Sequence, residues 1–188
     1  GMGDSIVLDP YDIYQMNKHL GVKFEELLNH KISLHAEEGL ILPNLKMQGK
    51  EDGCAFLNEE GRCTIHAFRP GFCRLFPLGR IYEDGSFSYY LQSQECTKAN
   101  RTKVKVNKWL GIPDLKQYEN FVNEWHYFLK DTKALLLRLS DARLNQELSM
   151  YLLNRFYTTA FDLESDFYKQ FDERMTQMKK LIYTLDRQ

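Results

Sequence analysis

Four cysteines are the residues of this chain whose type and spacing could do chemistry. They are Cys54, Cys63, Cys73 and Cys96, and the segments between them hold 8, 9 and 22 residues. Four thiolates can hold one tetrahedral zinc ion at about 2.3 Å if the chain lets the sulfur atoms converge. Gly53, Gly61 and Gly71 lie one or two residues before three of these cysteines, where they allow the backbone to turn toward a sulfur.

The spacing alone leaves three interpretations open. The cysteines could bind a metal, form two disulfides, or be small buried apolar residues, because the gaps are longer than those of a compact Cys-x-x-Cys knuckle. Charge is compatible with the metal, since four thiolates around a divalent ion leave a charge of about -2. Arg62, Arg69 and Arg74 lie in or between the cysteine loops, where they would offset that charge and lower the thiol pKa values.

Three strings in the same region carry a resemblance to a known family. They read Cys-x-Phe-Leu from residue 54, Gly-Arg-Cys-x-Ile from residue 61, and Arg-Pro-x-x-Cys-Arg-x-Phe-Pro-Leu from residue 69. Over about residues 5–98 the chain resembles the zinc- or iron-chelating cysteine-cluster family, which is named for a Cys-x-x-Cys-x-x-Cys-Cys motif. The resemblance implies that Cys54, Cys63, Cys73 and Cys96 are metal ligands, with zinc expected and iron or an iron–sulfur cluster as the alternative. His66 is the next candidate ligand.

The motif that names this family would lie just before Asp4, where the sequence begins. The resemblance therefore implies either a fragment of a longer protein or a member with half of the family's cysteines. The same family domain occurs in flagellin lysine methylase. This implies an alternative function as a protein lysine methyltransferase-like enzyme or an iron–sulfur redox protein.

Glycine and proline are confined to the first part of the chain. All 11 Gly and all 5 Pro lie at or before Pro113, so the last 75 residues contain no strong breaker of regular structure. Apolar residues at steps of three and four predict three helices within 113–188. Ser140 or Asp141 is expected to cap the second helix, and Asp162 or Ser165 the third. Six side chains are expected to be buried in this tail: Trp125, Leu129, Leu136, Tyr151, Phe156 and Met178.

The first part of the chain shows shorter elements. Asp9 followed by proline predicts a helix start, and Gly21 predicts its end. Residues 23–29 fit a second helix, and residues 32–45 read as extended chain broken by glycine and proline. Residues 80–82 and 87–91 flank an Asp-Gly pair, which predicts a β-hairpin.

Composition excludes several classes of protein. Lys+Arg total 25 and Asp+Glu total 26, so the net charge of -1 disfavours a nucleic-acid binder. The basic residues of 98–108 are expected to form a solvated face. No apolar run approaches the roughly 18 residues of a transmembrane helix, and the N-terminus lacks a secretory pattern. We therefore expect a bacterial cytoplasmic protein without a membrane partner, in which the thiols stay reduced.

These observations predict an α+β, mostly α protein. Residues 4–107 would form a cysteine-rich module with N-terminal helices, and residues 108–188 a three-helix tail packed on it. The predicted function is metal chelation in which the metal is mainly structural. No HExxH, GxSxG, P-loop or dinucleotide-binding glycine string is found, so no catalytic constellation is identified. The physiological protein partner is not predicted.

Overall fold

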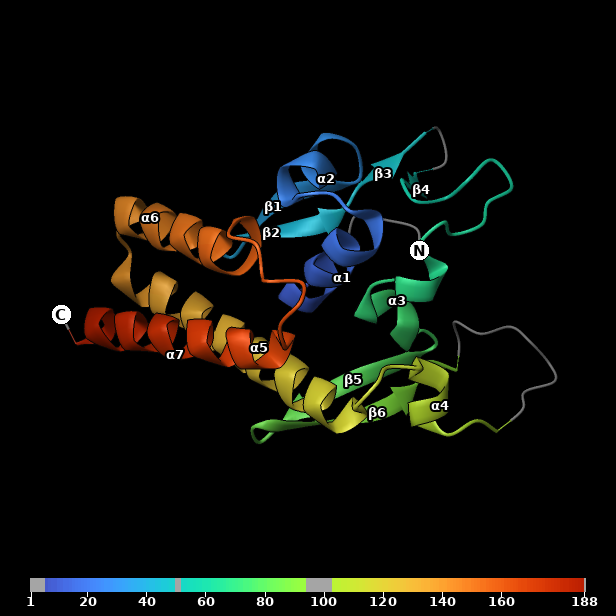
Figure 1. Ribbon diagram of the computed structural model, residues 1–188. Coiled ribbons are helices and arrows are strands. Elements are labelled where there is room, and N and C mark those ends of the chain that lie inside the picture. Colours follow the sequence, from blue (N-terminus) through green and yellow to red (C-terminus); the bar gives the residue numbers. More distant parts are fainter. Residues whose placement is uncertain (1–5, 50–51, 94–102, 188) are drawn as a thin grey trace.

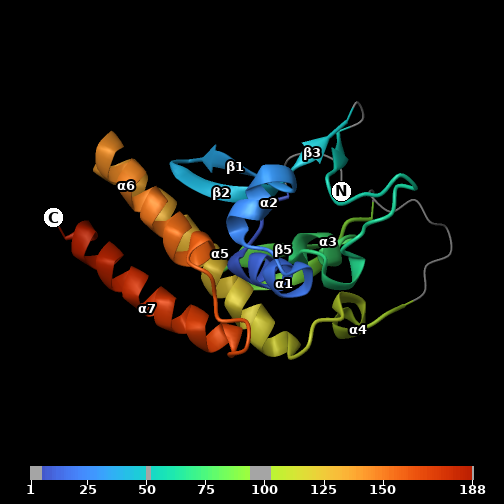
Figure 2. The same ribbon diagram turned by 45° about the horizontal axis from the view of Figure 1, so that its top comes forward.

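The computed structural model describes residues 6–49, 52–93 and 103–187. Figures 1 and 2 show three long C-terminal helices on one side of the molecule, and the loops of residues 52–70 on the opposite side. The elements, in chain order, are α1 (Pro10–Leu20), α2 (Phe24–His30), β1 (Ile32–Glu37), β2 (Leu40–Leu45), β3 (Met47–Gln48), β4 (Gly53–Cys54), η1 (His66–Phe68), α3 (Gly71–Leu75), β5 (Leu78–Glu83), β6 (Ser86–Leu91), α4 (Val106–Leu110), α5 (Leu115–Leu139), α6 (Ala142–Leu153), η2 (Asn154–Thr158) and α7 (Phe167–Asp186). The predicted α+β, mostly α class is confirmed.

Local signals define α1 at both ends. Asp9 is the N-cap, and its carboxylate accepts from the Asp12 amide at 2.9 Å, while the Asp12 carboxylate accepts from the Asp9 amide at 3.0 Å. This reciprocal capping box satisfies two N–H groups that the helix cannot pair internally. Gly21 ends the helix in the left-handed conformation, with φ of 66°.

The strands form three separate antiparallel pairs among the described residues. Residues 32–45, expected as broken extended chain, form the β1–β2 hairpin, in which Leu34 lies opposite Pro43. The predicted hairpin is β5–β6, and its Asp84-Gly85 turn has positive φ at both residues, as a two-residue turn of this kind requires. Its tip is attached to α5: the Gly85 amide donates to the Tyr127 hydroxyl at 3.1 Å, and Asn123 donates to the Gly85 carbonyl at 2.8 Å.

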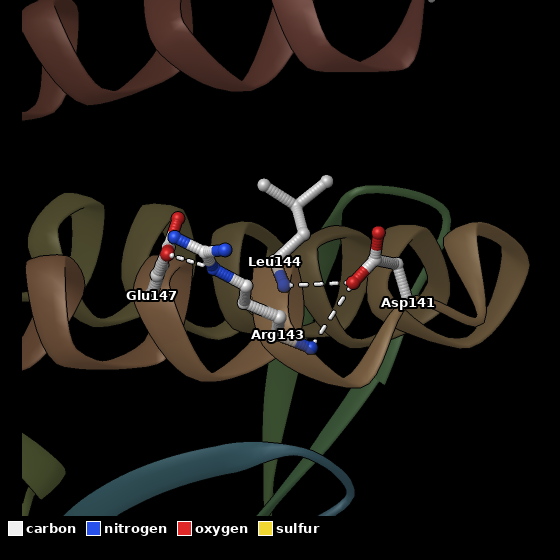
Figure 3. A network of polar contacts seen from close by, with 4 residues as sticks. All are labelled: Asp141, Arg143, Leu144 and Glu147. Carbon is white, nitrogen blue, oxygen red and sulfur yellow. Dashed lines mark hydrogen bonds and ion pairs between the residues drawn. The ribbon is translucent and has the colours of Figure 1, made fainter.

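The tail contains the three predicted helices, with one predicted cap confirmed and one wrong. Figure 3 shows Asp141 at the start of α6, where one carboxylate oxygen accepts from the Arg143 and Leu144 amides at 3.0 Å each. The cap of α7 is Asp166, which accepts from the Lys169 amide at 2.7 Å. Asp162 and Ser165 precede this cap and hydrogen-bond to each other instead.

The side chains predicted to be buried in the tail are buried or partly buried, with one clear exception. Trp125, Leu136, Phe156 and Met178 are buried, and Leu129 is partly buried. Tyr151 is 45% exposed, so its predicted burial is wrong. The reason is that α6 turns Leu148, Ser149, Leu152 and Leu153 inward, which leaves Tyr151 on the outer face.

One continuous hydrophobic cluster joins the N-terminal helices, the first hairpin and the tail. Tyr11 of α1 lies 5.1 Å from the Phe167 ring of α7, and Phe121 of α5 lies 5.4 Å from the same ring. Trp125 stacks edge-on against Phe156 at 4.9 Å. Aromatic pairs at these separations add to the free energy gained by burying the rings. No helix in the described ranges has the length and apolar character needed to span a membrane.

Candidate metal centre

Each described cysteine is carried by a short, irregular element. Cys54 ends β4 and lies opposite Met47 of β3. Cys63 forms an isolated bridge with Leu57 at the base of a tight loop. Within that loop the Asn58 side chain accepts from the Arg62 amide at 2.9 Å. Cys73 lies in the middle of α3, which has only five residues.

The loop between Cys54 and Cys63 is anchored by two buried apolar side chains. Phe56 is 3% exposed and Ile65 is 1% exposed. The Phe56 carbonyl accepts from both the amide and the hydroxyl of Thr64, at 2.8 and 2.9 Å. Lys31 at the end of α2 donates to the Ala55 carbonyl at 2.7 Å. These contacts hold the loop against the N-terminal helices and the first hairpin.

A buried carboxylate and a clamped arginine position α3, and with it Cys73. The Gly71 amide donates to Asp12 of α1 at 2.8 Å. The Arg74 guanidinium donates to three carbonyls, those of Arg69, Leu110 and Ala67. The donors of Arg74 are therefore used to hold backbone segments together, a role different from the predicted balancing of thiolate charge.

Cys54 and Cys63 lie close enough to Cys73 to affect its pKa. Burial raises the pKa of the Cys73 thiol to about 12, and the charges of Asp12, Cys54 and Cys63 add to that effect. All three thiols are free. A metal must displace a proton from Cys73 to bind there, since the thiolate is the ligand.

The structure does not bring these sulfur atoms to ligating distance. Over residues 6–49, 52–93 and 103–187, no group of three His, Cys, Asp or Glu side chains is placed to hold a metal ion. Cys96, the fourth predicted ligand, lies outside the described residues, as do Lys98 and Arg101 of the basic segment. The donors present are the soft thiols that zinc and iron prefer, so the donor chemistry fits such an ion although the geometry is incomplete.

The side chains of His66 and Arg62, which lie in the cysteine-containing segment, face solvent. His66 is exposed, and its ring nitrogens lie 2.7 and 3.1 Å from the Arg69 guanidinium. Arg62 has a side chain 81% exposed and pairs loosely with Glu60 at 3.7 Å.

Residues 4–108 match the model of a family named CxxCxxCC and described as a "Putative zinc- or iron-chelating domain". The chain belongs to the CxxCxxCC family. This confirms the family that the cysteine strings predicted. No curated protein and no solved structure matches the chain.

The CxxCxxCC match contains all four cysteines and ends within α4, so the helices α5 to α7 lie outside it. Sequence reasoning identified the cysteines but missed Asp12, which links α1 to the Cys73 helix. The only available signal was local: an acid three residues after the cap Asp9 is typical of a capping box. Nothing in the sequence indicates that its other oxygen binds Gly71, 59 positions away.

Asp12 should make the stability of the CxxCxxCC domain depend on pH. Burial raises the pKa of Asp12 from 3.8 to about 6 in the folded protein, against the opposing effect of the Gly71 and Asp9 amides. The folded state therefore binds this proton more tightly than the unfolded state, so the stabilisation is full below about pH 4 and is lost as pH rises toward 6. Burial also raises the pKa of Asp9, the other member of the capping box, so both carboxyls change the stability in the same direction.

Urea unfolding at several pH values between 4 and 7 measures this dependence. Asp12→Asn keeps an acceptor for Gly71 but cannot titrate, so its unfolding free energy should fall less across this window than that of the wild type. Equal slopes for the two proteins would show that Asp12 does not carry the effect.

Gly71 should be intolerant of any side chain. A Cβ added there would lie 2.0 Å from the hydroxyl oxygen of Tyr118, whose ring is buried and cannot swing away. We expect Gly71→Ala to destabilise the protein by about 1–3 kcal/mol. In a Tyr118→Phe background the nearest atom is Cζ at 3.3 Å, so the same substitution should cost clearly less.

A double-mutant cycle by urea unfolding tests the Gly71–Tyr118 contact. Gly53→Ala is the control, because an added Cβ there meets nothing closer than 3.7 Å. An equal cost of Gly71→Ala in both backgrounds would contradict the contact.

Proposed function

We propose that this CxxCxxCC protein chelates one metal ion, with zinc preferred over iron, through Cys54, Cys63, Cys73 and Cys96. The observation that supports the proposal best is that three free cysteines from three separate segments lie close together, so that Cys54 and Cys63 contribute to the raised pKa of Cys73. Burial and the neighbouring Asp12, Cys54 and Cys63 raise the pKa of Cys73 to about 12, so this residue is held as a neutral thiol. A divalent cation would displace that proton and draw the sulfur atoms together.

The metal would have a mainly structural role in this proposal. Between residues 52 and 76 the described regular structure is limited to a two-residue strand, a three-residue 3₁₀ helix and the five-residue α3. Cys54 ends the strand β4, Cys63 lies in the loop before the 3₁₀ helix, and Cys73 lies in α3. An ion bound to them would link segments that few backbone hydrogen bonds connect.

Cobalt substitution gives a direct test of the ligand set. The protein is purified anaerobically under reducing conditions, its metal content is measured, and Co²⁺ is titrated into the stripped protein while thiolate charge-transfer absorbance is recorded. We expect one ion per chain in a tetrahedral, thiolate-rich site. Each Cys→Ser variant should lose more affinity than the roughly 10- to 100-fold that follows loss of a group that only orients a ligand.

His66→Ala is the matched control for the cysteine variants. His66 is exposed and faces Arg69, so its removal should leave metal affinity unchanged. A loss equal to that of a cysteine variant would instead show a site of three cysteines and one histidine. A brown protein with visible absorbance as isolated would favour the iron–sulfur form, and no metal binding by the wild type would refute the proposal.

A further inference from the structure

A small pocket lies where α1 approaches α3. It has a volume of about 260 Å³ and is enclosed by α1, the η1–α3 segment, the Gly111–Pro113 turn and the start of α5. Figure 2 shows α1 and α3 lying side by side at this place. The volume is slightly below the usual range of drug-sized ligand sites, so the pocket would suit an ion or a small metabolite.

Two arginines give this pocket its positive charge. Arg69 and Arg74 both line it, and the Arg74 Nε donates to the Arg69 carbonyl at 3.1 Å. Three backbone carbonyls hold the Arg74 guanidinium in place, which leaves two of its five N–H groups for a ligand. Neighbouring guanidinium groups are a typical arrangement for binding an oxyanion.

The other polar residues of the lining favour the same ligand. His19 stacks on Phe68 at 4.6 Å, which holds its ring at the pocket wall as a further N–H donor. Asp12 is an acid in the lining, but both of its oxygens accept backbone N–H groups, from Gly71 and Asp9. Its charge is therefore partly compensated within the protein.

Tyr118 also lines the pocket, and its buried hydroxyl group lacks a hydrogen-bond acceptor among the described residues. The residue is 1% exposed, and its hydroxyl proton has no hydrogen-bond acceptor within the described part of the chain. The Arg80 guanidinium lies beside the hydroxyl and can donate to its oxygen, but it carries donors alone and cannot accept the Tyr118 proton. A buried hydroxyl without a partner costs free energy, which an acceptor supplied by a ligand would recover.

We propose that this pocket binds a small molecule through a single oxyanion group, a carboxylate or a phosphate, held by Arg69, Arg74 and the Tyr118 hydroxyl. Phe68, Ile112 and Pro113 provide apolar surface for the remainder of the molecule. Gly71 and Arg74 flank Cys73 in the chain, so the ligand would lie against the helix that carries one proposed metal ligand. The inference does not rest on the proposed metal, and both metal-free and metal-loaded protein can test it.

Titrations with succinate and with inorganic phosphate, at constant ionic strength, test the proposal and separate the two ligand chemistries. Amide chemical shifts and calorimetry are recorded for wild-type protein and for Arg69→Gln, Tyr118→Phe and Arg62→Gln. We expect saturable one-to-one binding of at least one probe, with shifts at Gly71 and Gly111. Arg69→Gln and Tyr118→Phe should each weaken binding about tenfold, the loss expected for one hydrogen bond to a charged group.

Arg62→Gln is the matched control, because it removes the same charge from an exposed arginine outside the pocket. Its affinity should equal that of the wild type. Tyr118→Phe keeps the buried ring and removes the hydroxyl alone, so it should fold normally, and a melting curve checks this. The proposal is overturned by the absence of saturable binding of both probes, by an equal loss in Arg62→Gln, or by unchanged affinity in Arg69→Gln or Tyr118→Phe.

Discussion

Removing the metal should unfold residues 52–76 while α5, α6 and α7 stay helical. The binding free energy of a structural zinc is folding free energy, about 10–16 kcal/mol in zinc-finger peptides, and the segment has little regular structure to replace it. Phe56 and Ile65 are the buried anchors of this segment, so the loop of residues 57–64 between them should lose its protection first. The tail keeps its own aromatic core, in which Trp125, Phe156 and Phe171 pack together.

Hydrogen exchange with mass spectrometry, combined with far-ultraviolet circular dichroism, measures this result during a chelator titration. Cys73→Ser should resemble the chelated wild type, because three thiolates and a hydroxyl bind zinc far less well. His66→Ala serves again as the control. Full protection of residues 54–75 in metal-free protein would indicate a preformed site, and the metal would then be present for chemistry, as the lysine methyltransferase-like and redox alternatives require.

Trp125→Ala should destabilise the protein by about 3–5 kcal/mol. The indole is 6% exposed and contacts Phe128, Phe156 and Phe171 from three elements of the tail. The substitution leaves a cavity that these rings cannot fill without giving up their present packing contacts. A loss of this size is a large fraction of the stability of a single domain.

Trp109→Ala is the matched control for Trp125→Ala. Trp109 is 40% exposed and donates one hydrogen bond, to the Phe76 carbonyl, so its removal should cost about 1 kcal/mol. Urea unfolding followed by circular dichroism compares the two variants without relying on tryptophan fluorescence. Similar costs for both would show that Trp125 is peripheral to the core.

The features that the sequence predicts well depend on neighbouring residues. Asp9, Pro10 and Gly21 determine α1, and each acts within one helical turn. The Asp84-Gly85 pair likewise predicts its hairpin, because few residues adopt a positive φ readily. The cap of α7 could not be chosen on the same grounds, since Asp162, Ser165 and Asp166 are all good caps and only tertiary contacts select among them.

The features that the sequence predicts poorly depend on distant contacts. The outward turn of Tyr151 follows from the way α6 packs on β2, where the Ser149 hydroxyl accepts from the Ile41 amide at 2.8 Å. The cysteine types predict a soft-metal site, but the sulfur positions depend on how three loops approach one another. The pocket beside α3 combines residues from α1 to α5, so no single motif indicates it.

The attachment of the β5–β6 tip to α5 has a practical consequence for labelling this protein. Turns of hairpins are usually the preferred places for an inserted tag or a fluorophore, because they tolerate added residues. Here the turn exchanges hydrogen bonds with Asn123 and Tyr127, so an insertion between Asp84 and Gly85 would detach the hairpin from the long helix. A probe placed there would report on its own disturbance of the fold rather than on the protein.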